Sequence, residues 1–247
     1  MPDPEILYHK HEVLDSTNQN LYHIGKDTTI DKIVVWTVKQ TQGKGYMGNA
    51  WHADAAENIT MSLLLRRPHI ALHEMALINY YICTQVVNSL SKWHIEAKIK
   101  WPNDIVIENR KVGGLLVENR LMQGKIDYCV VGLGLNVYQK VFTGLPNAAS
   151  IKLFMPNFDV EIDQMVKEIA QSVYAHVQDL KSENAGLLMS EYFTRLAYLK
   201  EWRKYKYRDS ILVARLISIN TRGDALFEFE DGPNLWLKHK EIEFLYK

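Results

Sequence analysis

The stretch QTQGKGYMGNAW, Gln40–Trp51, decides between two folds, because its glycines have the G-x-G-x-x-G spacing of a dinucleotide-binding loop. The run KIVVWTV before it, Lys32–Val38, is rich in β-branched residues and predicts a buried strand. A dinucleotide site also needs a helix that opens at the last glycine and an acidic residue about 20 positions further on. Neither follows, because a second strand, ITMSLLL, begins at Ile59 after a stretch without a sustained apolar face. The sequence therefore predicts a strand, a glycine-rich loop and another strand instead of a dinucleotide-binding fold.

The composition excludes several classes of protein. A chain of 247 residues can bury a full core, and a formal net charge of +0 argues against general binding to nucleic acids or membrane surfaces. The start, MPDPEILYHKHEV, is not a signal peptide, and no apolar run reaches the roughly 18 residues needed to span a bilayer. Cys83 and Cys129 lie in apolar runs and are expected to be buried free thiols. We therefore expect a soluble cytoplasmic protein without membrane contact.

Periodicity and turn signals divide the chain into two parts. The first part contains a predicted apolar helix, several short strands and two amphipathic helices, over residues 71–93, 97–137, 161–180 and 191–202. From Asp209 onward, short alternating strands separated by turn residues predict a small all-β barrel. We place the boundary near residue 204, which gives a larger domain over 1–204 and a β domain over 205–247. So short a β domain is expected to pack on the larger one.

Five short stretches place polar or small residues within otherwise apolar, strand-like sequence. They are DSTN at Asp15–Asn18, the glycine loop with Gln40, KWPND at Lys100–Asp104, KVGGLLVE at Lys111–Glu118 and GLGLN at Gly132–Asn136. Buried polar groups cost free energy unless they are hydrogen-bonded, so several of them at one place suggest that a ligand supplies the partners. The five stretches therefore predict a shared binding site.

Each stretch taken alone also has an ordinary structural explanation. Ser16 or Thr17 is suited to cap the first turn of a helix, and KWPND to form a turn around Pro102 and Asn103. The glycines that follow Lys111 are typical of a β-bulge beside a solvated lysine. They would equally let a ligand approach the backbone, with the lysine placing positive charge on a phosphate or carboxylate. Taken alone, the motif leaves both interpretations of the lysine open.

Together and in this order, the five stretches resemble biotin protein ligases, and the resemblance extends from about Leu14 to the C-terminus. KWPND followed closely by K-x-G-G is its most specific part. The resemblance implies an α+β fold: a mixed β-sheet flanked by helices, with a small C-terminal SH3-like β-barrel. It also implies a two-step reaction. Biotin and Mg-ATP give biotinyl-5'-adenylate and pyrophosphate, and a lysine of a carboxylase's biotin carboxyl carrier domain then takes the biotinyl group.

The same resemblance implies roles for individual residues. Lys111 would be the catalytic cation at the biotin carboxylate and the transferring phosphate, and Asp104 would orient the incoming lysine or help to deprotonate it, unless it only caps the turn. The residues implied to bind biotin are Ser16, Thr17, Asn18, Gln40, Gly43, Lys111, Gly113 and Gly114. Those implied to bind ATP or the adenylate are Lys44, Gly45, Tyr46, Trp51, Asn103, Lys111, Gly132, Gly134 and Asn136. Mg²⁺ is expected with ATP, and no residue is assigned as a metal ligand.

The chain departs from the family pattern at the glycine loop. Many members have arginines that order over the adenylate at the places that Lys44, Tyr46 and Asn49 take here. A single lysine binds phosphate as a point charge and lacks the two-pronged contact of arginine, so we expect the intermediate to be held less tightly or by other groups. A second departure is that fifteen residues precede Ser16, too few for the N-terminal winged-helix domain of some members. We therefore expect no specific DNA binding.

Two rival functions remain open. A lipoate or octanoate transferase of the same superfamily would share the core fold and a lysine at the position of Lys111, but is expected to lack KWPND and the C-terminal barrel. A non-catalytic biotin-binding module would fit the reduced charge of the glycine loop. The family also makes a homodimer plausible, although the sequence shows no interface.

Overall fold

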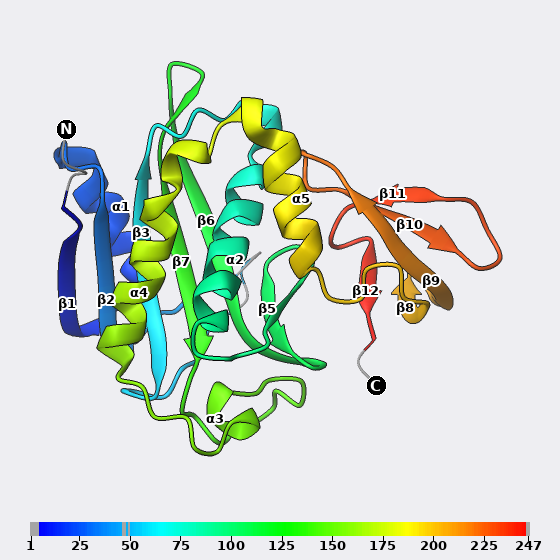
Figure 1. Cartoon of the computed structure of the whole chain (residues 1–247), viewed down its shortest axis with the longest axis horizontal. Helices are drawn as coiled ribbons and strands as arrows, with labels where there is room; N and C mark the ends of the chain where they lie inside the picture. The colour runs from blue at the N-terminus through cyan, green and yellow to red at the C-terminus, as the bar shows by residue number, and fades with distance from the viewer. Residues whose placement is uncertain (1–4, 46–47, 49, 246–247) are drawn as a thin grey trace.

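The structure of the chain, a computed structural model, describes residues 5–45, 48 and 50–245. Tyr46 and Asn49, which belong to the expected phosphate-binding loop, lie outside these residues. Seven strands form a mixed sheet in the order β1-β2-β3-β7-β6-β5-β4, in which only β1 and β2 pair in parallel (Figure 1). The strands are β1 Leu7–Leu14, β2 Ile33–Gln40, β3 Asn58–Arg66, β4 Lys98–Lys100, β5 Asp104–Ile107, β6 Arg110–Met122 and β7 Lys125–Asn136.

Helices cover both faces of this sheet. The helices are α1 Thr17–Asp27, α2 Ala76–Ser91, α3 Ile151–Phe154, α4 Ile162–Ala175 and α5 Ala185–Arg195, with 3-10 turns η2 Leu72–Glu74, η3 Val177–Asp179 and η4 Ser182–Asn184. Successive side chains of a strand point to opposite faces. Leu63 and Val131 therefore lie in the main core beneath α2, α4 and α5, which Figure 1 shows in front of the sheet. Leu64 and Val130 pack against Leu21 of α1 in a smaller core on the other face.

A second, antiparallel sheet follows at the C-terminus, in the order β11-β10-β9-β8-β12. Its strands are β8 Arg203–Tyr207, β9 Ser210–Ile219, β10 Ala225–Phe229, β11 Leu235–Leu237 and β12 Ile242–Phe244. This small β unit beside a mixed sheet flanked by helices confirms the expected fold class. The two sheets share one core: the ring of Trp101 packs edge-on against Phe227, with 6.2 Å between ring centroids. The Tyr80 hydroxyl also donates to the carbonyl of Asn220 at 3.0 Å.

Two sequence expectations need correction. The helix expected over residues 191–202 begins earlier, at Ala185, and ends at Arg195. Its start is hard to read, because no side chain caps it and a 3-10 turn precedes it. The strand β8 was missed, since RKYKY is mostly basic, but Tyr205 at its centre is completely buried while Lys204 and Lys206 point outward. The boundary near residue 204, which falls just inside β8, stays a prediction.

Within the described residues, every helix is too short or too polar to cross a membrane.

Candidate active site

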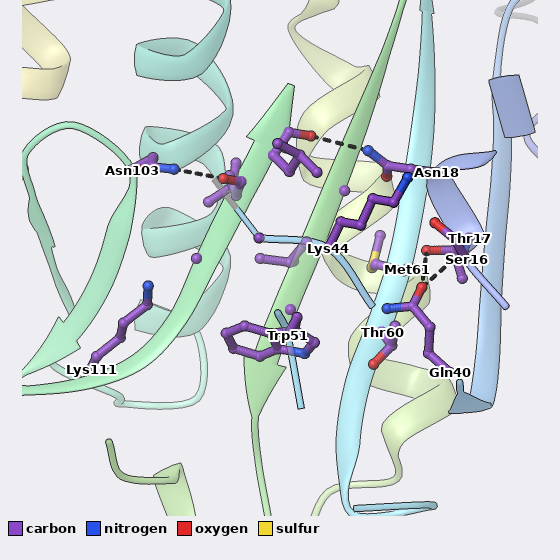
Figure 2. A pocket seen from close by; sticks show the side chains of 17 residues that line it. Ser16, Thr17, Asn18, Gln40, Lys44, Trp51, Thr60, Met61, Asn103 and Lys111 are labelled. Atoms are coloured by element: carbon purple, nitrogen blue, oxygen red, sulfur yellow. Dashed lines mark hydrogen bonds between the residues drawn. The ribbon is translucent and has the colours of Figure 1, made fainter. Parts of the chain in front are cut away.

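The candidate site lies on the face of the mixed sheet that α1 covers only in part. Beyond the residues beneath α1, Thr60 and Ser62 of β3 pair with Gly134 and Gly132 of β7 and continue the same face. Figure 2 shows this face with the larger helices behind it. A cavity forms here, lined by Ser16, Thr17, Asn18, Gln40, Lys44, Gly45, Trp51, Thr60, Met61, Asn103, Lys111, Gly114, Leu115, Leu116, Gly132, Leu133 and Gly134. All five stretches singled out in the sequence therefore meet at one cavity.

The start of α1 and the end of β2 form the polar end of the cavity. Ser16 is the N-cap of α1, and its hydroxyl accepts from the backbone N–H of Gln19 at 3.3 Å, which confirms the capping interpretation of DSTN. The backbone N–H of Thr17 donates to Gln40 Oε1 at 2.9 Å, and the Thr17 hydroxyl lies 3.3 Å from the same oxygen (Figure 2). Gln40 is thereby fixed with its carbonyl oxygen toward the helix. A cap and a cavity wall are built from the same residues.

Asn18 is held between two strands by hydrogen bonds that the sequence does not reveal. Its Nδ2 donates to the Glu118 carboxylate at 2.7 Å and lies 3.4 Å from the Leu116 carbonyl oxygen. Its Oδ1 accepts from the Ser62 hydroxyl at 2.6 Å. Ser62 also lies 2.8 Å from the Thr17 hydroxyl and is completely buried. The amide of Asn18 is therefore engaged at both ends by protein groups.

Two glycines of β7 make room for the side chains above the sheet. A Cβ at Gly132 would collide with Oδ1 of Asn18, and a Cβ at Gly134 would overlap the indole ring of Trp51. Both backbones are paired with strands on either side, so they have no freedom to move away. The GLGLN stretch is thus required for close packing, and no positive φ angle is involved at either glycine.

The described ends of the glycine loop pair with each other beside the cavity. Lys44 and Ala50 pair in an antiparallel bridge, and the N–H of Trp51 donates to the Gly43 carbonyl at 3.0 Å. A Cβ at Gly43 would lie 2.7 Å from Nε2 of Gln40, so this glycine also permits a close approach. In Figure 2 the side chain of Lys44 extends across the cavity toward Asn18. Gly43 itself supports the wall, whereas Lys44 and Gly45 line the cavity.

Lys111 reaches the cavity because of an irregularity in the pairing of β5 and β6. Ile105 pairs with Gly113 and Val106 with Lys111, so Val112 has no partner in β5. Such an extra residue changes the face to which the following side chains point. Lys111 consequently lies on the same side of β6 as Gly114. A Cβ added at Gly114 would lie 3.3 Å from Nζ of Lys111. The bulge expected from the sequence is therefore present, and Lys111 lines the cavity, while its contact with a ligand phosphate or carboxylate stays a prediction.

Asp104 holds two lysines at the far end of the cavity. Its Oδ1 lies 2.5 Å from Nζ of Lys111 and its Oδ2 lies 3.2 Å from Nζ of Lys100, which stands opposite in β4. The Asp104 side chain is 15% exposed, whereas that of Lys111 is 36% exposed and accessible to a ligand. Burial would raise the pKa of Asp104, but the charges of Lys111 and Lys100 outweigh it and lower the pKa below its ordinary value. The carboxyl group is therefore ionised at neutral pH.

This lowered pKa predicts a specific acid dependence of stability. A carboxyl group whose pKa is lower in the folded chain stabilises the fold above its unfolded value, here 3.8, and stops doing so as the pH falls through the folded value. Urea unfolding should show Asp104→Asn less stable than the wild type by about 2 kcal/mol at about pH 7, a moderate figure because Lys111 is partly exposed. The difference should shrink below pH 3.8. A difference of the same size at about pH 3 would contradict this account.

Two predicted site residues, Asn136 and Gly113, lie behind the cavity surface, whereas Asn103 lines the cavity. Asn103 Nδ2 donates to the Leu115 carbonyl at 2.6 Å, and the Asn103 carbonyl accepts from the N–H of Leu115 at 3.1 Å, which fixes the KWPND turn on β6. Asn136 Nδ2 donates to the Ala149 carbonyl at 3.0 Å, and the N–H of Ala149 donates to the carbonyl of Lys111 at 2.8 Å. Asn136 thus supports the strand that carries Lys111. Gly113 faces away from the cavity, toward the carbonyl of Gly134.

Some buried polar atoms around the site have no hydrogen-bond partner among the described residues. They include the indole Nε1 of Trp51 and Oδ1 of Asn136. An orphaned buried donor or acceptor costs free energy, so a site that offers both is suited to a ligand with polar atoms of its own. Lys44 and Lys111, which are also expected to bind ATP, line the same cavity.

Sequence reasoning missed three residues of the site: Thr60, Ser62 and Glu118. Thr60 and Ser62 are polar and spaced by two in a strand that is otherwise apolar between its end residues, Asn58 and Arg66. That spacing puts both on one face, and it was the signal available in the sequence. Glu118 lies within the KVGGLLVE stretch, but nothing in the sequence indicates that β6 passes over Asn18.

The comparisons with known proteins agree with this geometry. A sequence model of the Biotin/lipoate A/B protein ligase family matches residues 11–136. The bifunctional ligase/repressor BirA of Bacillus subtilis is 32% identical over 131 residues, which cover 53% of this chain and 40% of that protein. The biotin--[acetyl-CoA-carboxylase] ligase of Mycobacterium tuberculosis is 29% identical over 141 residues, which cover 55% of this chain and 51% of that protein. The chain thus spans about two fifths to one half of these relatives' length.

Solved structures show the same fold. Biotin protein ligase from Aquifex aeolicus, solved with biotin and ATP, has a TM-score of 0.74 at 21% identity, over 98% of this chain and 99% of that chain. Biotin protein ligase from Leishmania major, solved with biotinyl-5-AMP, has a TM-score of 0.66 at 17% identity, over 94% and 98% of the two chains. Because the matched residues 11–136 make up just over half of the sequence and contain all five motifs, the chain belongs to the Biotin/lipoate A/B protein ligase family.

Proposed function

We propose that the protein is an ATP-dependent ligase that activates biotin as biotinyl-5'-adenylate and transfers it to a lysine of a biotin carboxyl carrier domain. One observation carries the proposal: a single cavity has a hydrogen-bonding end at Thr17 and Gln40 and a cation at Lys111. Biotin matches these two ends, because it has a cyclic urea at one end and a carboxylate at the other. The relatives named as biotin ligases support the same assignment.

The polar end favours biotin over the acids of the sister enzymes. Thr17, Asn18 and Ser62 are buried, and Gln40 completes the group. A cyclic urea offers two N–H donors and a carbonyl acceptor to such groups. The dithiolane ring of lipoate and the methyl end of octanoate offer neither, so they would leave these polar groups desolvated without partners. The structure therefore supports the lipoate and octanoate alternative less well.

Lys111 is suited to the first chemical step. A carboxylate oxygen of biotin attacks the α-phosphorus of ATP, a P–O bond forms, and the bond to pyrophosphate breaks. The two reacting groups are both anions, so a fixed cation between them lowers the barrier. The Nζ of Lys111 is held by Asp104 and remains partly exposed toward the cavity. We assign it to the oxygens that gain charge during this step.

Asp104 is assigned an orienting role instead of a proton-accepting one. In the second step the amine of the acceptor lysine attacks the acyl carbon, AMP leaves, and the amine loses a proton. A carboxylate whose pKa lies below its ordinary value is a poor base for this proton. The negative charge of Asp104 attracts ammonium groups, and it already forms ion pairs with those of Lys100 and Lys111.

The nucleotide is assigned to the space bordered by Trp51, Lys44 and Lys111. The indole N–H of Trp51, which has no partner among the described residues, would find one there. The described residues include no group of three or more His, Cys, Asp or Glu side chains arranged to hold a metal ion. Mg²⁺ is therefore assigned to the substrate Mg-ATP, where phosphate oxygens and water supply most of its ligands. A cytoplasmic location belongs to the proposal, because Cys83 and Cys129 are buried free thiols.

Labelling of a carrier domain tests the proposal. The protein is incubated with biotin, Mg-ATP and an isolated biotin carboxyl carrier domain, and the intact mass of the carrier is measured. We expect one biotinyl group on the acceptor lysine, and none on a carrier in which that lysine is replaced by arginine. An unmodified carrier at the end of the reaction would contradict the transfer step, and modification of both carriers would contradict its specificity.

A further inference from the structure

We propose that Ser62 is a positioning residue that makes the Thr17 hydroxyl a hydrogen-bond acceptor toward the ligand, and so sets the preference for a ring with N–H donors. This inference deepens the proposed function and rests on biotin as the ligand. It is drawn from the directions that the hydrogen bonds of four side chains can take. This series of hydrogen bonds runs from Thr17 through Ser62 and Asn18 to Glu118.

The orientation of the Asn18 amide determines which atoms donate and which accept in this series of hydrogen bonds. Its Nδ2 lies 2.7 Å from the Glu118 carboxylate and 3.4 Å from the Leu116 carbonyl, and both of these partners can only accept. The opposite flip of the amide would place Oδ1 against two acceptors. Oδ1 therefore faces Ser62, at 2.6 Å. Glu118 is largely exposed, but the backbone carbonyl of Leu116 imposes the same orientation.

Ser62 transmits this direction because a hydroxyl has one proton. Two oxygens lie within reach of it, Thr17 Oγ1 at 2.8 Å and Asn18 Oδ1 at 2.6 Å. The amide oxygen of Asn18 cannot donate, so it accepts the hydrogen bond from the Ser62 hydroxyl. In the contact between the two hydroxyls, Thr17 is then the donor and Ser62 the acceptor. Ser62 is completely buried, so water does not supply an alternative partner.

Thr17 consequently presents oxygen lone pairs to the cavity. Its proton is directed at Ser62, which is nearer, at 2.8 Å, than Gln40 Oε1 at 3.3 Å. Gln40 Oε1 already accepts from the backbone N–H of Thr17 at 2.9 Å, which leaves Nε2 of Gln40 as a donor. The polar end thus offers one acceptor and one donor side by side. A cyclic urea has the complementary N–H and carbonyl, and a dithiolane ring has neither.

Substitution of Ser62 tests this role. Ser62→Ala removes the donor to Asn18 and frees the proton of Thr17, so the dissociation constant for biotin, measured by calorimetry without ATP, should rise about tenfold. Ser62→Cys replaces the hydroxyl with a larger thiol that is only a weak donor, and should behave like Ser62→Ala. The KM for ATP should change little. Ser89→Ala, which removes another completely buried serine on α2, is the matched control and should bind biotin like the wild type.

A double-mutant cycle with Thr17→Val shows whether Ser62 acts through Thr17. In the Thr17→Val background, Ser62→Ala should change biotin affinity less than about twofold, because the hydroxyl that Ser62 orients is already gone. An equal loss in both backgrounds, or wild-type affinity in Ser62→Cys, would overturn the inference. If the wild type binds biotin but forms no adenylate, the proposed ligase activity fails while this inference stands. If the wild type binds no biotin, both fail.

Discussion

Lys111→Ala is expected to slow acyl-adenylate formation by about 10² to 10³, the size seen when one preorganised charge-stabilising donor is removed. The physical reason is that the ammonium group is the partly exposed cation at the cavity, held by Asp104 at 2.5 Å. The loss should appear mainly in the rate of the first step, measured by pyrophosphate release under single-turnover conditions. Biotin affinity should fall less, because the urea end of the cavity is untouched.

Two further variants separate charge from position in this experiment. Lys111→Arg keeps the positive charge but moves it, and should recover only part of the rate, since arginine has a different reach and geometry. Lys125→Ala removes an exposed lysine at the start of β7 and should retain the wild-type rate. A Lys111→Ala rate within threefold of the wild type would remove Lys111 from the mechanism.

Gly134→Ala is expected to reduce adenylate formation by about 10- to 100-fold, although it adds one methyl group. The new Cβ would overlap the indole ring of Trp51, and β7 cannot retreat because it is paired with β3 and β6. Overpacking of this kind costs about 1–3 kcal/mol. Here it is expected to displace the indole ring of Trp51 from its place over the nucleotide site. The measurement is the affinity for a non-hydrolysable ATP analogue together with the adenylation rate.

The cause can be tested by removing the indole. In a Trp51→Ala background, Gly134→Ala should add less than about threefold to the loss, because the clash no longer exists. Gly186→Ala is the matched control: its Cβ meets no atom within 4 Å, and helix α5 should gain about 0.5–1 kcal/mol of stability. A Gly134→Ala protein with full activity would show that Trp51 does not need its present position.

The sequence predicted the site best where chemistry and local structure coincide. The resemblance to biotin protein ligases implied that Ser16, Thr17 and Gln40 belong to the site, the local pattern of DSTN predicted a helix cap, and the structure places all three residues at one cavity. The role of Lys111 depends on the unpaired Val112, which the two following glycines suggested as a bulge. In both cases the local signal predicted the local structure, and the family resemblance supplied the role.

The remaining features depend on contacts between distant segments. Ser62 was missed because its partners, Thr17 and Asn18, lie more than 40 positions away and only the sheet brings them together. Asn136 was expected at the nucleotide, but its donor group supports the loop at Ala149, which only the fold reveals. The strand β8 was missed because three of its five residues are charged, while its one buried tyrosine packs on a core made by other segments. Such contacts follow from topology, which periodicity alone does not specify.

Adenylation in a mixture of acids tests the central claim most directly. The purified protein is incubated with Mg-ATP and equal amounts of biotin, lipoate and octanoate, and the acyl-adenylates are identified by mass spectrometry. The account predicts biotinyl-adenylate together with pyrophosphate, because only biotin satisfies the groups around Thr17 and Gln40. Lipoyl- or octanoyl-adenylate as the main product, or biotin that binds without forming an adenylate, would contradict it.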